Sequence, residues 1–348
     1  MSYYIMITFF LRINPKYLKD FLEIISNIEF SNRVRKQSMK RVSGIIVLIV
    51  TGLLLHAAEP IVPIPRAVSY NAAKAALGEK LFADPILSKD RTVACISCHD
   101  VSSSGADGKK FSTGIRNLQG TMNAPTVFNA AFNFAQFWNG RAKTLSEQAL
   151  GPIHNPVEMG LPLPEAARRL QSHPEYAKAF SAITGRATLT PDDIAVMIAE
   201  YEKTLITPNA KFDRYLRGEI RLSPLEAEGY LLFKTLGCVS CHNGVNIGAN
   251  SFQKMGAIIS IPYDAKVSDR YALTKRPIDK NVYKVPTLRN IARTAPYFHD
   301  GSAATLSEAI ARMSYHNLGV TLTPREIRAL VAFLQTLDGE LPSKTARR

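Results

Sequence analysis

The sequence predicts an all-α protein made of two similar halves. A Leu-Phe pair followed by the pattern C-x-x-C-H occurs twice, with the patterns at 95–99 and 238–242. Helix-start signals of the form Ser/Thr-Pro-x-Asp/Glu begin at Thr190, Ser223 and Thr323. Strand signals are few and short, and the segments between the helical patterns are rich in Gly, Pro and Ser, which is typical of long loops.

Helical periodicity and capping residues give the order of the elements along the chain. Asp84-Pro85 is expected to stop the first helix, and Gly151-Pro152 is expected to stop the second. Helices are expected at 71–82, 144–150, 165–172, 174–183, 190–205, 305–315 and 323–337, with a further one running from Ser223 into the second C-x-x-C-H pattern.

The two C-x-x-C-H motifs match the attachment signature of c-type haem. Two thiols at this spacing can bond both vinyl groups of one porphyrin, and the adjacent histidine can bind the iron as proximal ligand. The attachment cysteines would be Cys95, Cys98, Cys238 and Cys241, which are all the cysteines of the chain, and the proximal ligands His99 and His242. Redox or zinc C-x-x-C motifs are the alternative. The coarse repeat therefore suggests two cytochrome c-like domains, each with one covalent haem.

The first 58 residues have the pattern of an export signal. Met39-Lys40-Arg41 is a basic start, and an apolar run from Ile45 to Leu55 follows it, with small residues at Ala57-Ala58. We expect Met39 to be the true start of the protein and the chain to reach the periplasm. The run is short for a membrane span, although an uncleaved anchor is the alternative.

Composition limits the classes of function. The 348 residues carry a net charge of +14, with 46% hydrophobic and 21% charged residues, as in a globular protein of two ordinary domains. No basic cluster is interleaved with aromatic residues, so nucleic acid is not an expected partner.

The sixth iron position decides what each haem can do. A methionine there gives an electron-transfer haem, and an open position can bind peroxide. After the second motif the methionine candidates are Met255 and Met313. Met313 lies near the end of the helix expected at 305–315, where cytochrome domains commonly supply this ligand.

Beyond the two motifs, the chain resembles the bacterial di-haem cytochrome c peroxidases and the related MauG-type enzymes. The resemblance covers about 76–342. Matching stretches are LGEKLFADPILS (77–88), APTVFNAAFNFAQFWNGRAKTLSEQALGPIHNPVEMG (124–160), YEKTLITPNAKFDRYLRG (201–218), GCVSCHNGVNIG (237–248), VPTLRNIARTAPYFHDGS (285–302) and VAFLQTLDGELP (331–342). It implies an N-terminal domain at 59–206, joined by the tail 338–348, and a C-terminal domain at 207–337.

The resemblance also implies roles. The haem on His99 would be the peroxidatic centre, with Glu158 and Gln148 in its distal pocket. The haem on His242, with Met313 as axial ligand, would store electrons. Trp138, the single tryptophan, matches the family residue between the two haems.

Further implied features concern a metal ion and partners. A calcium ion would bind Asn123 and the carbonyl oxygens of Thr294 and Pro296, which suit a hard cation. Met122 replaces the arginine that usually precedes Asn123. The family reduces hydrogen peroxide with electrons from a mono-haem cytochrome c or a small copper protein (a cupredoxin), and commonly forms homodimers.

One departure from the family pattern concerns the first haem. Many members carry a histidine in the loop after the first motif, where it blocks the peroxidatic iron. Ile115 falls at that position here and cannot bind iron. We therefore hypothesise that the first haem is permanently open. The alternative is that His154 takes the place of the missing ligand.

Two other functions are weighed against a peroxidase. A MauG-like oxidase that modifies a partner protein would have tyrosine where Met313 stands, although Tyr315 is close by. A non-enzymatic di-haem electron carrier would not need a distal acid such as Glu158.

Overall fold

This computed structural model of the protein describes residues 59–342. The predicted signal sequence and the last six residues lie outside the described part. Within it, no helix is both long enough and apolar enough to cross a membrane.

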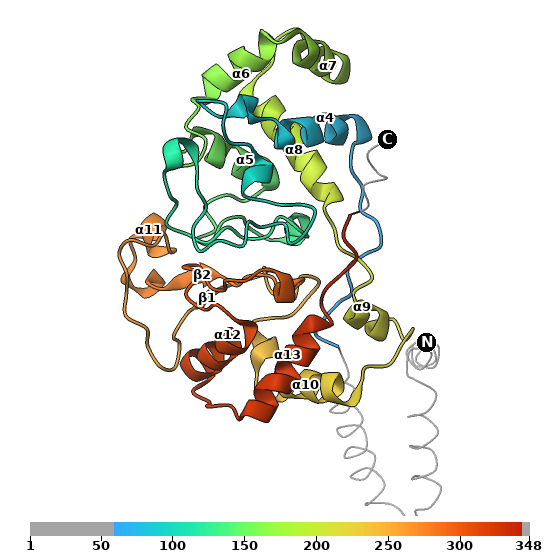
Figure 1. Ribbon diagram of the computed structural model, residues 1–348, viewed down its shortest axis with the longest axis vertical. Helices are drawn as coiled ribbons and strands as arrows, with labels where there is room; N and C mark the ends of the chain where they lie inside the picture. Colours follow the sequence, from blue (N-terminus) through green and yellow to red (C-terminus); the bar gives the residue numbers. More distant parts are fainter. Residues whose placement is uncertain (1–58, 343–348) are drawn as a thin grey trace, which may run out of the picture. The chain divides into compact units, whose positions relative to one another are not determined.

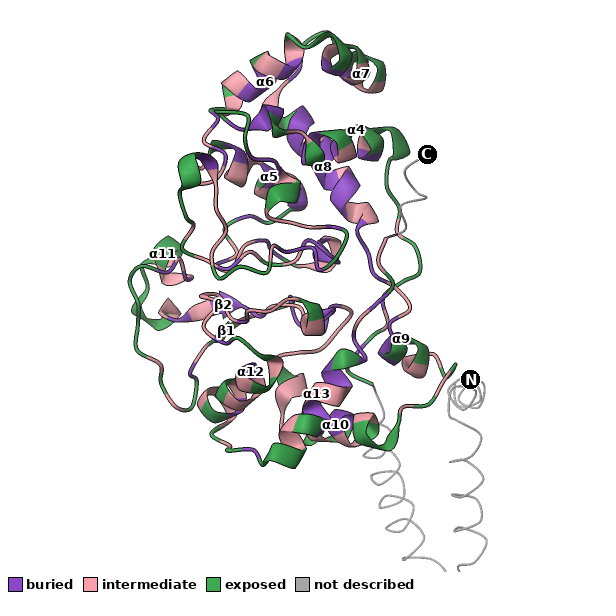
Figure 2. Ribbon diagram, viewed as in Figure 1, coloured by how far each residue is buried: buried purple, intermediate pink, exposed green. Residues whose placement is uncertain are grey.

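The first half of the described chain is a group of helices around one hydrophobic core (Figure 1). Its central pair is α4 (Ala72–Ala83) and α8 (Pro191–Thr204), and α8 is largely buried (Figure 2). Around this pair lie α5 (Leu145–His154), α6 (Leu163–Gln171) and α7 (Pro174–Thr184).

The second half repeats this plan around a second core. Its central pair is α10 (Pro224–Thr235) and α13 (Pro324–Gln335). The remaining helices are α9 (Lys211–Leu216), α11 (Tyr271–Thr274) and α12 (Leu306–Met313), and a π-helical turn, Ser314–Leu318, follows α12.

The strands are short, as the sequence predicts. β1 (Phe252–Lys254) and β2 (Val282–Lys284) form one antiparallel pair in which Gln253 lies opposite Tyr283. The predicted all-α class with few strands is confirmed.

Local hydrogen bonds explain where the helices begin. Thr190, Ser223 and Thr323 each accept a hydrogen bond from the backbone N–H three residues on, and the carboxylate at that position accepts one from the backbone N–H of the cap. These are capping boxes with proline at the first helical position, as predicted.

The predicted end of the second helix is wrong. α5 passes through Gly151-Pro152 and ends at His154. Proline lacks only its own N–H, so one bond to the Gln148 carbonyl is absent, while the rest of the helix is held by its packing against α8. Gly151 also fits closely against the Phe137 ring, where a larger residue would not.

In each half, a glycine lies at the point where the two central helices cross. A Cβ on Gly78 would overlap the Met197 carbonyl, and a Cβ on Gly229 would overlap the Ala329 carbonyl. The absence of a side chain lets each pair of backbones approach closely. The two crossings are therefore equivalent places in the two halves.

A second repeat lies in the loops. Isolated bridges join Gln136 to Ala142 and Tyr297 to Ala303, and Phe137 and Phe298 both have positive φ. The offset along the chain is the same for each pair, so 123–147 and 284–308 are equivalent segments.

Buried polar side chains tie the halves together. The Thr207 hydroxyl accepts hydrogen bonds from the amide groups of Asn129 (2.8 Å) and Asn290 (2.9 Å). After α13 the chain returns, and Leu341 packs against the first core. The domain boundaries given above stay predictions.

Candidate functional site

Each C-x-x-C-H motif forms one tight turn. In the first, the backbone N–H groups of Cys98 and His99 both donate to the Cys95 carbonyl, at 3.1 and 3.0 Å. In the second, His242 donates in the same way to Cys238, at 3.0 Å. None of the four thiols is in a disulfide.

Both motif histidines have Nδ1 close to a backbone carbonyl oxygen. Nδ1 of His99 lies 3.2 Å from the Gly105 carbonyl oxygen, and Nδ1 of His242 lies 3.3 Å from the Ile247 carbonyl oxygen. Donation from Nδ1 fixes the tautomer that leaves Nε2 free for a metal. Burial lowers the pKa of His99 and lowers that of His242 to about 4, which favours the neutral, ligating form.

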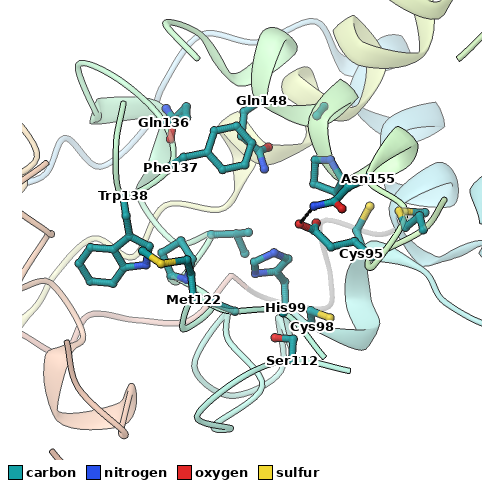
Figure 3. A pocket seen from close by; sticks show the side chains of 18 of the residues that line it. Cys95, Cys98, His99, Ser112, Met122, Gln136, Phe137, Trp138, Gln148 and Asn155 are labelled. Atoms are coloured by element: carbon teal, nitrogen blue, oxygen red, sulfur yellow. Dashed lines mark hydrogen bonds between the residues drawn. The ribbon is translucent and has the colours of Figure 1, made fainter. Parts of the chain in front are cut away.

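A cavity of about 520 Å³ lies at the first motif. Cys95, Cys98 and His99 line it, and Phe137 and Gln148 face the His99 ring from the other side (Figure 3). Its volume is within the range of cofactor pockets, roughly 300–1,000 Å³. Burial raises the pKa of the Cys95 thiol to about 12, so this is a protonated, unpaired thiol in apolar surroundings. The thiols, the free imidazole and the cavity together fit a covalently bound haem.

A carboxyl group lies in the wall of this cavity. Glu158 accepts a hydrogen bond of 2.6 Å from the Asn155 amide, drawn in Figure 3. Burial raises the pKa of Glu158, while the Asn155 hydrogen bond and the nearby charge of Arg141 act against this rise. The Arg141 guanidinium lies over the Phe137 ring, 3.3 Å from its centroid. A carboxyl with these partners can accept and return a proton at a ligand in the cavity.

The loop that carries Ile115 packs against the backbone at Glu158. Ile115 donates its backbone N–H to the Glu158 carbonyl at 2.9 Å, and its side chain is 3% exposed. Gly114 has no room for a Cβ beside the Val157 carbonyl. His154 is exposed, binds the Leu150 carbonyl through Nδ1 at 2.7 Å, and is not among the residues that line the cavity.

Trp138 lies where the two halves meet. It lines the first cavity, and its Nε1 donates to the Asn123 carbonyl at 2.8 Å. The backbone N–H of Lys284 donates to the Trp138 carbonyl, and that of Asn123 donates to the His299 carbonyl. Because Asn123 and Lys284, like Trp138 and His299, are equivalent residues, these bonds form a matched pair.

The second half has a cavity of about 270 Å³. Met255, Phe298 and His299 line it, and the last two are equivalent to Phe137 and Trp138. Met313 is the last residue of α12, is half-buried, and does not line this cavity. Its role as an axial ligand stays a prediction.

The predicted calcium ligands come from both halves. The Asn123 amide donates to the Lys109 carbonyl at 2.8 Å, and Thr294 donates its hydroxyl to the Ile291 carbonyl at 3.3 Å. The peptide bond before Pro296 is cis. Within 59–342 no three His, Cys, Asp or Glu side chains gather around one point, but the expected ligands are mostly carbonyl oxygens. The calcium site stays a prediction.

Among the polar residues that line the first cavity, Arg141, Asn155 and Glu202 were missed by sequence reasoning. Glu202 had a local signal, because it follows Ile198 by four positions and therefore lies on the apolar face of its helix. Arg141 and Asn155 are loop and helix-end residues whose position depends on the tertiary fold.

Comparisons with known proteins agree with this geometry. The family model described as di-haem cytochrome c peroxidase matches residues 72–221, and the cytochrome c model matches residues 226–338. The first match covers the first helix group and α9, and the second match covers the other helices of the second group.

Individual relatives cover most of the chain. The cytochrome c551 peroxidase of Nitrosomonas europaea is 47% identical over 83% of this chain and 87% of its own length. That of Pseudomonas aeruginosa is 41% identical over 80% of this chain and 84% of its own length. A crystal structure of a MauG-like protein associated with microbial copper homeostasis has a TM-score of 0.73 at 27% identity, covering 84% of this chain and 97% of its own.

Proposed function

The chain belongs to the di-haem cytochrome c peroxidase family and is an oxidoreductase acting on hydrogen peroxide, and we propose that peroxide is reduced in the first cavity with Glu158 as the acid–base group. The observation that carries this proposal is a half-buried carboxyl in the wall of the cavity that also contains Cys95, Cys98 and His99.

Two covalent haem c groups are the cofactors of this family. Cys95 and Cys98 would hold the first and Cys238 and Cys241 the second, with His99 and His242 as proximal ligands. When bound, haem supplies an iron that can bind peroxide or exchange single electrons. Met313 is proposed as the axial ligand of the second haem, the electron store.

The reaction takes up two electrons and two protons for each peroxide and forms two molecules of water. Glu158 would accept the proton of the peroxide oxygen nearer the haem and give it to the oxygen farther from the haem, so that the farther oxygen leaves as water. The Asn155 hydrogen bond holds the carboxyl in place, and the Gln148 amide can orient the peroxide. The positive charge of Arg141 favours the ionised carboxylate, which is the form that accepts the proton.

We further propose that the first site is open in the oxidised protein. Ile115 cannot bind iron, and His154 is turned towards the Leu150 carbonyl. An EPR spectrum of the oxidised protein should show a high-spin ferric signal beside a low-spin one, and the high-spin signal should disappear promptly with peroxide. Two low-spin signals, unreactive until one haem is reduced, would contradict an open site.

Location and partners are proposed from the sequence. The pattern at 39–58 supports export to the periplasm. A mono-haem cytochrome c or a cupredoxin is proposed as the electron donor, a homodimer as the assembly, and a calcium ion at Asn123, Thr294 and Pro296 as an additional ligand.

Turnover of peroxide with a reduced cytochrome c tests the assignment of Glu158. Glu158→Gln should lower the rate by about 10²–10⁴-fold, the usual contribution of a general acid–base group. Glu175→Gln is the control, because Glu175 is an exposed carboxyl paired with Lys80 at the surface, and it should retain full activity. Equal activity of the two variants would refute the role of Glu158.

A further inference from the structure

A second carboxyl lies in the wall of the first cavity and has no role in the mechanism above. Glu202, on α8, lines this cavity but is only 5% exposed. Within the described chain, its Oε2 has no hydrogen-bond partner. Burying a polar group without a partner is unfavourable, so this arrangement calls for a physical reason.

The equivalent place in the second half is apolar. In the first helix crossing, Gly78 fits against the Met197 carbonyl and the Tyr201 side chain. In the second, Gly229 fits in the same way against Ala329 and Phe333.

Tyr201 in α8 and Phe333 in α13 are therefore equivalent residues. The residues that follow them, Glu202 and Leu334, are equivalent as well. Leu334 is also 5% exposed and belongs to the second core. The fold thus buries a leucine at this place without difficulty, and only the half with the proposed peroxide site has a carboxyl there.

No charged neighbour offsets the burial of Glu202 in the described chain. Burial alone raises the pKa of Glu202 to about 8. The negative charge of Glu202 in turn adds to the rise in the pKa of the Cys95 thiol. The helices packed against α8 carry the ionisable residues Lys74, Glu79, Lys80, Glu147, His154, Glu165, Arg168 and Arg169, and none of them contributes to the shift of Glu202.

We propose that Glu202 is a redox-linked proton site of the first haem, which releases a proton when an electron leaves that haem and regains one when the donor returns an electron. The electron that leaves goes to peroxide, and the proton goes to water in the cavity. The proposal rests on the assignment of a haem to this cavity. It adds to that assignment a group that keeps the net charge of a buried site nearly constant.

The reason is electrostatic. A carboxylate in apolar surroundings stabilises an additional positive charge nearby much more than the same group would in water. Oxidation therefore favours the ionised form of Glu202, and reduction favours the protonated form. The reduction potential of the first haem should consequently fall as the pH rises through neutrality.

The test is the reduction potential of each haem in the whole protein, measured against pH without peroxide. Glu202→Gln and Glu202→Leu, the latter reproducing the residue at position 334, should remove the part of the pH dependence at the first haem that lies near pH 8 and leave the part due to Glu158. In both variants the reduction potential of the first haem should equal that of the unchanged protein at low pH. It should exceed the potential of the unchanged protein increasingly as the pH rises. Asp192→Asn removes an exposed carboxylate from the same helix and should behave like the unchanged protein.

The proposal fails if the unchanged protein and Glu202→Gln have the same pH dependence. Should neither variant fold, infrared difference spectra of Glu158→Gln between its oxidised and reduced forms decide the question. The C=O band of a protonated carboxylic acid must grow on reduction, and its constancy would refute the proposal. Because peroxide takes no part, these results are independent of turnover, so the failure of the peroxidase assignment would be recognised separately.

Discussion

The Trp138 and His299 rings lie 6.2 Å apart, centroid to centroid, and meet edge to face at 73°. Trp138 lines the first cavity and His299 lines the second, and the two residues are equivalent in the two halves. This aromatic pair therefore joins one wall residue of the first cavity to one wall residue of the second. His299 in turn stacks on Tyr283, with centroids 4.2 Å apart.

Replacement of Trp138 should slow electron transfer between the haems. Trp138→Phe loses the Nε1 hydrogen bond to Asn123 and the edge of the indole that faces His299. We expect a decrease of roughly tenfold, or ~1.4 kcal/mol in the barrier, in the rate measured by stopped-flow after peroxide is added to the half-reduced protein. Phe134→Leu, an exposed aromatic of the same segment, is the control and should not change the rate. An unchanged rate in Trp138→Phe would show that the indole is only a packing residue.

The reaction with peroxide should depend on the ionisation of Glu158. The carboxylate is the form that accepts a proton, and burial raises its pKa above the ordinary value. The second-order rate should therefore be high at pH values above this raised pKa and fall as the pH falls through it. Stopped-flow rates across the pH range measure the midpoint, and Glu158→Gln should have no such transition.

Arg141 should set the position of that midpoint. Its positive charge lowers the pKa of Glu158, so Arg141→Gln should move the midpoint to higher pH. Arg168→Gln, an exposed arginine paired with Glu165, is the matched control and should leave the midpoint unchanged. A midpoint that does not move in Arg141→Gln would mean that solvent screens the two groups from each other.

Removal of His154 should leave the first haem unchanged. Its side chain is exposed and its Nδ1 is bound to the Leu150 carbonyl. His154→Ala should give the same EPR spectrum as the unchanged oxidised protein. A high-spin signal that appears only in the variant would identify His154 as an iron ligand.

The glycine at the first helix crossing should be essential for stability. Gly78→Ala places a methyl group against the Met197 carbonyl, and forcing α4 and α8 apart should lower the free energy of unfolding by about 1–3 kcal/mol. Gly120→Ala is the control, since its Cβ would have only ordinary contacts at 3.9 Å. Thermal unfolding of the haem-containing protein measures both, and equal melting temperatures would contradict this account.

Features that depend on local sequence were predictable. The capping boxes at Thr190, Ser223 and Thr323 are formed by neighbouring residues, so their helix starts could be located without a structure. The end of α5 could not, because packing against α8 outweighs the local effect of Pro152.

The residues of the site also divide into those that local sequence predicts and those that depend on the tertiary fold. The C-x-x-C-H motifs are local, and the family resemblance named Trp138, Gln148 and Glu158, which the fold brings to one cavity. Arg141 was missed because its effect on Glu158 depends on the turn at Gly140, far from Glu158 in the sequence.

The shared hydroxyl of Thr207 has a consequence for electron tunnelling. Asn129 and Asn290, one from each half, donate to this single oxygen in a buried environment. A rotation of one half against the other would leave a buried amide without an acceptor, which is unfavourable by ~1–3 kcal/mol. We therefore expect little variation in the separation of the two prosthetic groups, and because tunnelling rates depend steeply on distance, internal transfer should proceed at one rate and not over a broad distribution of rates.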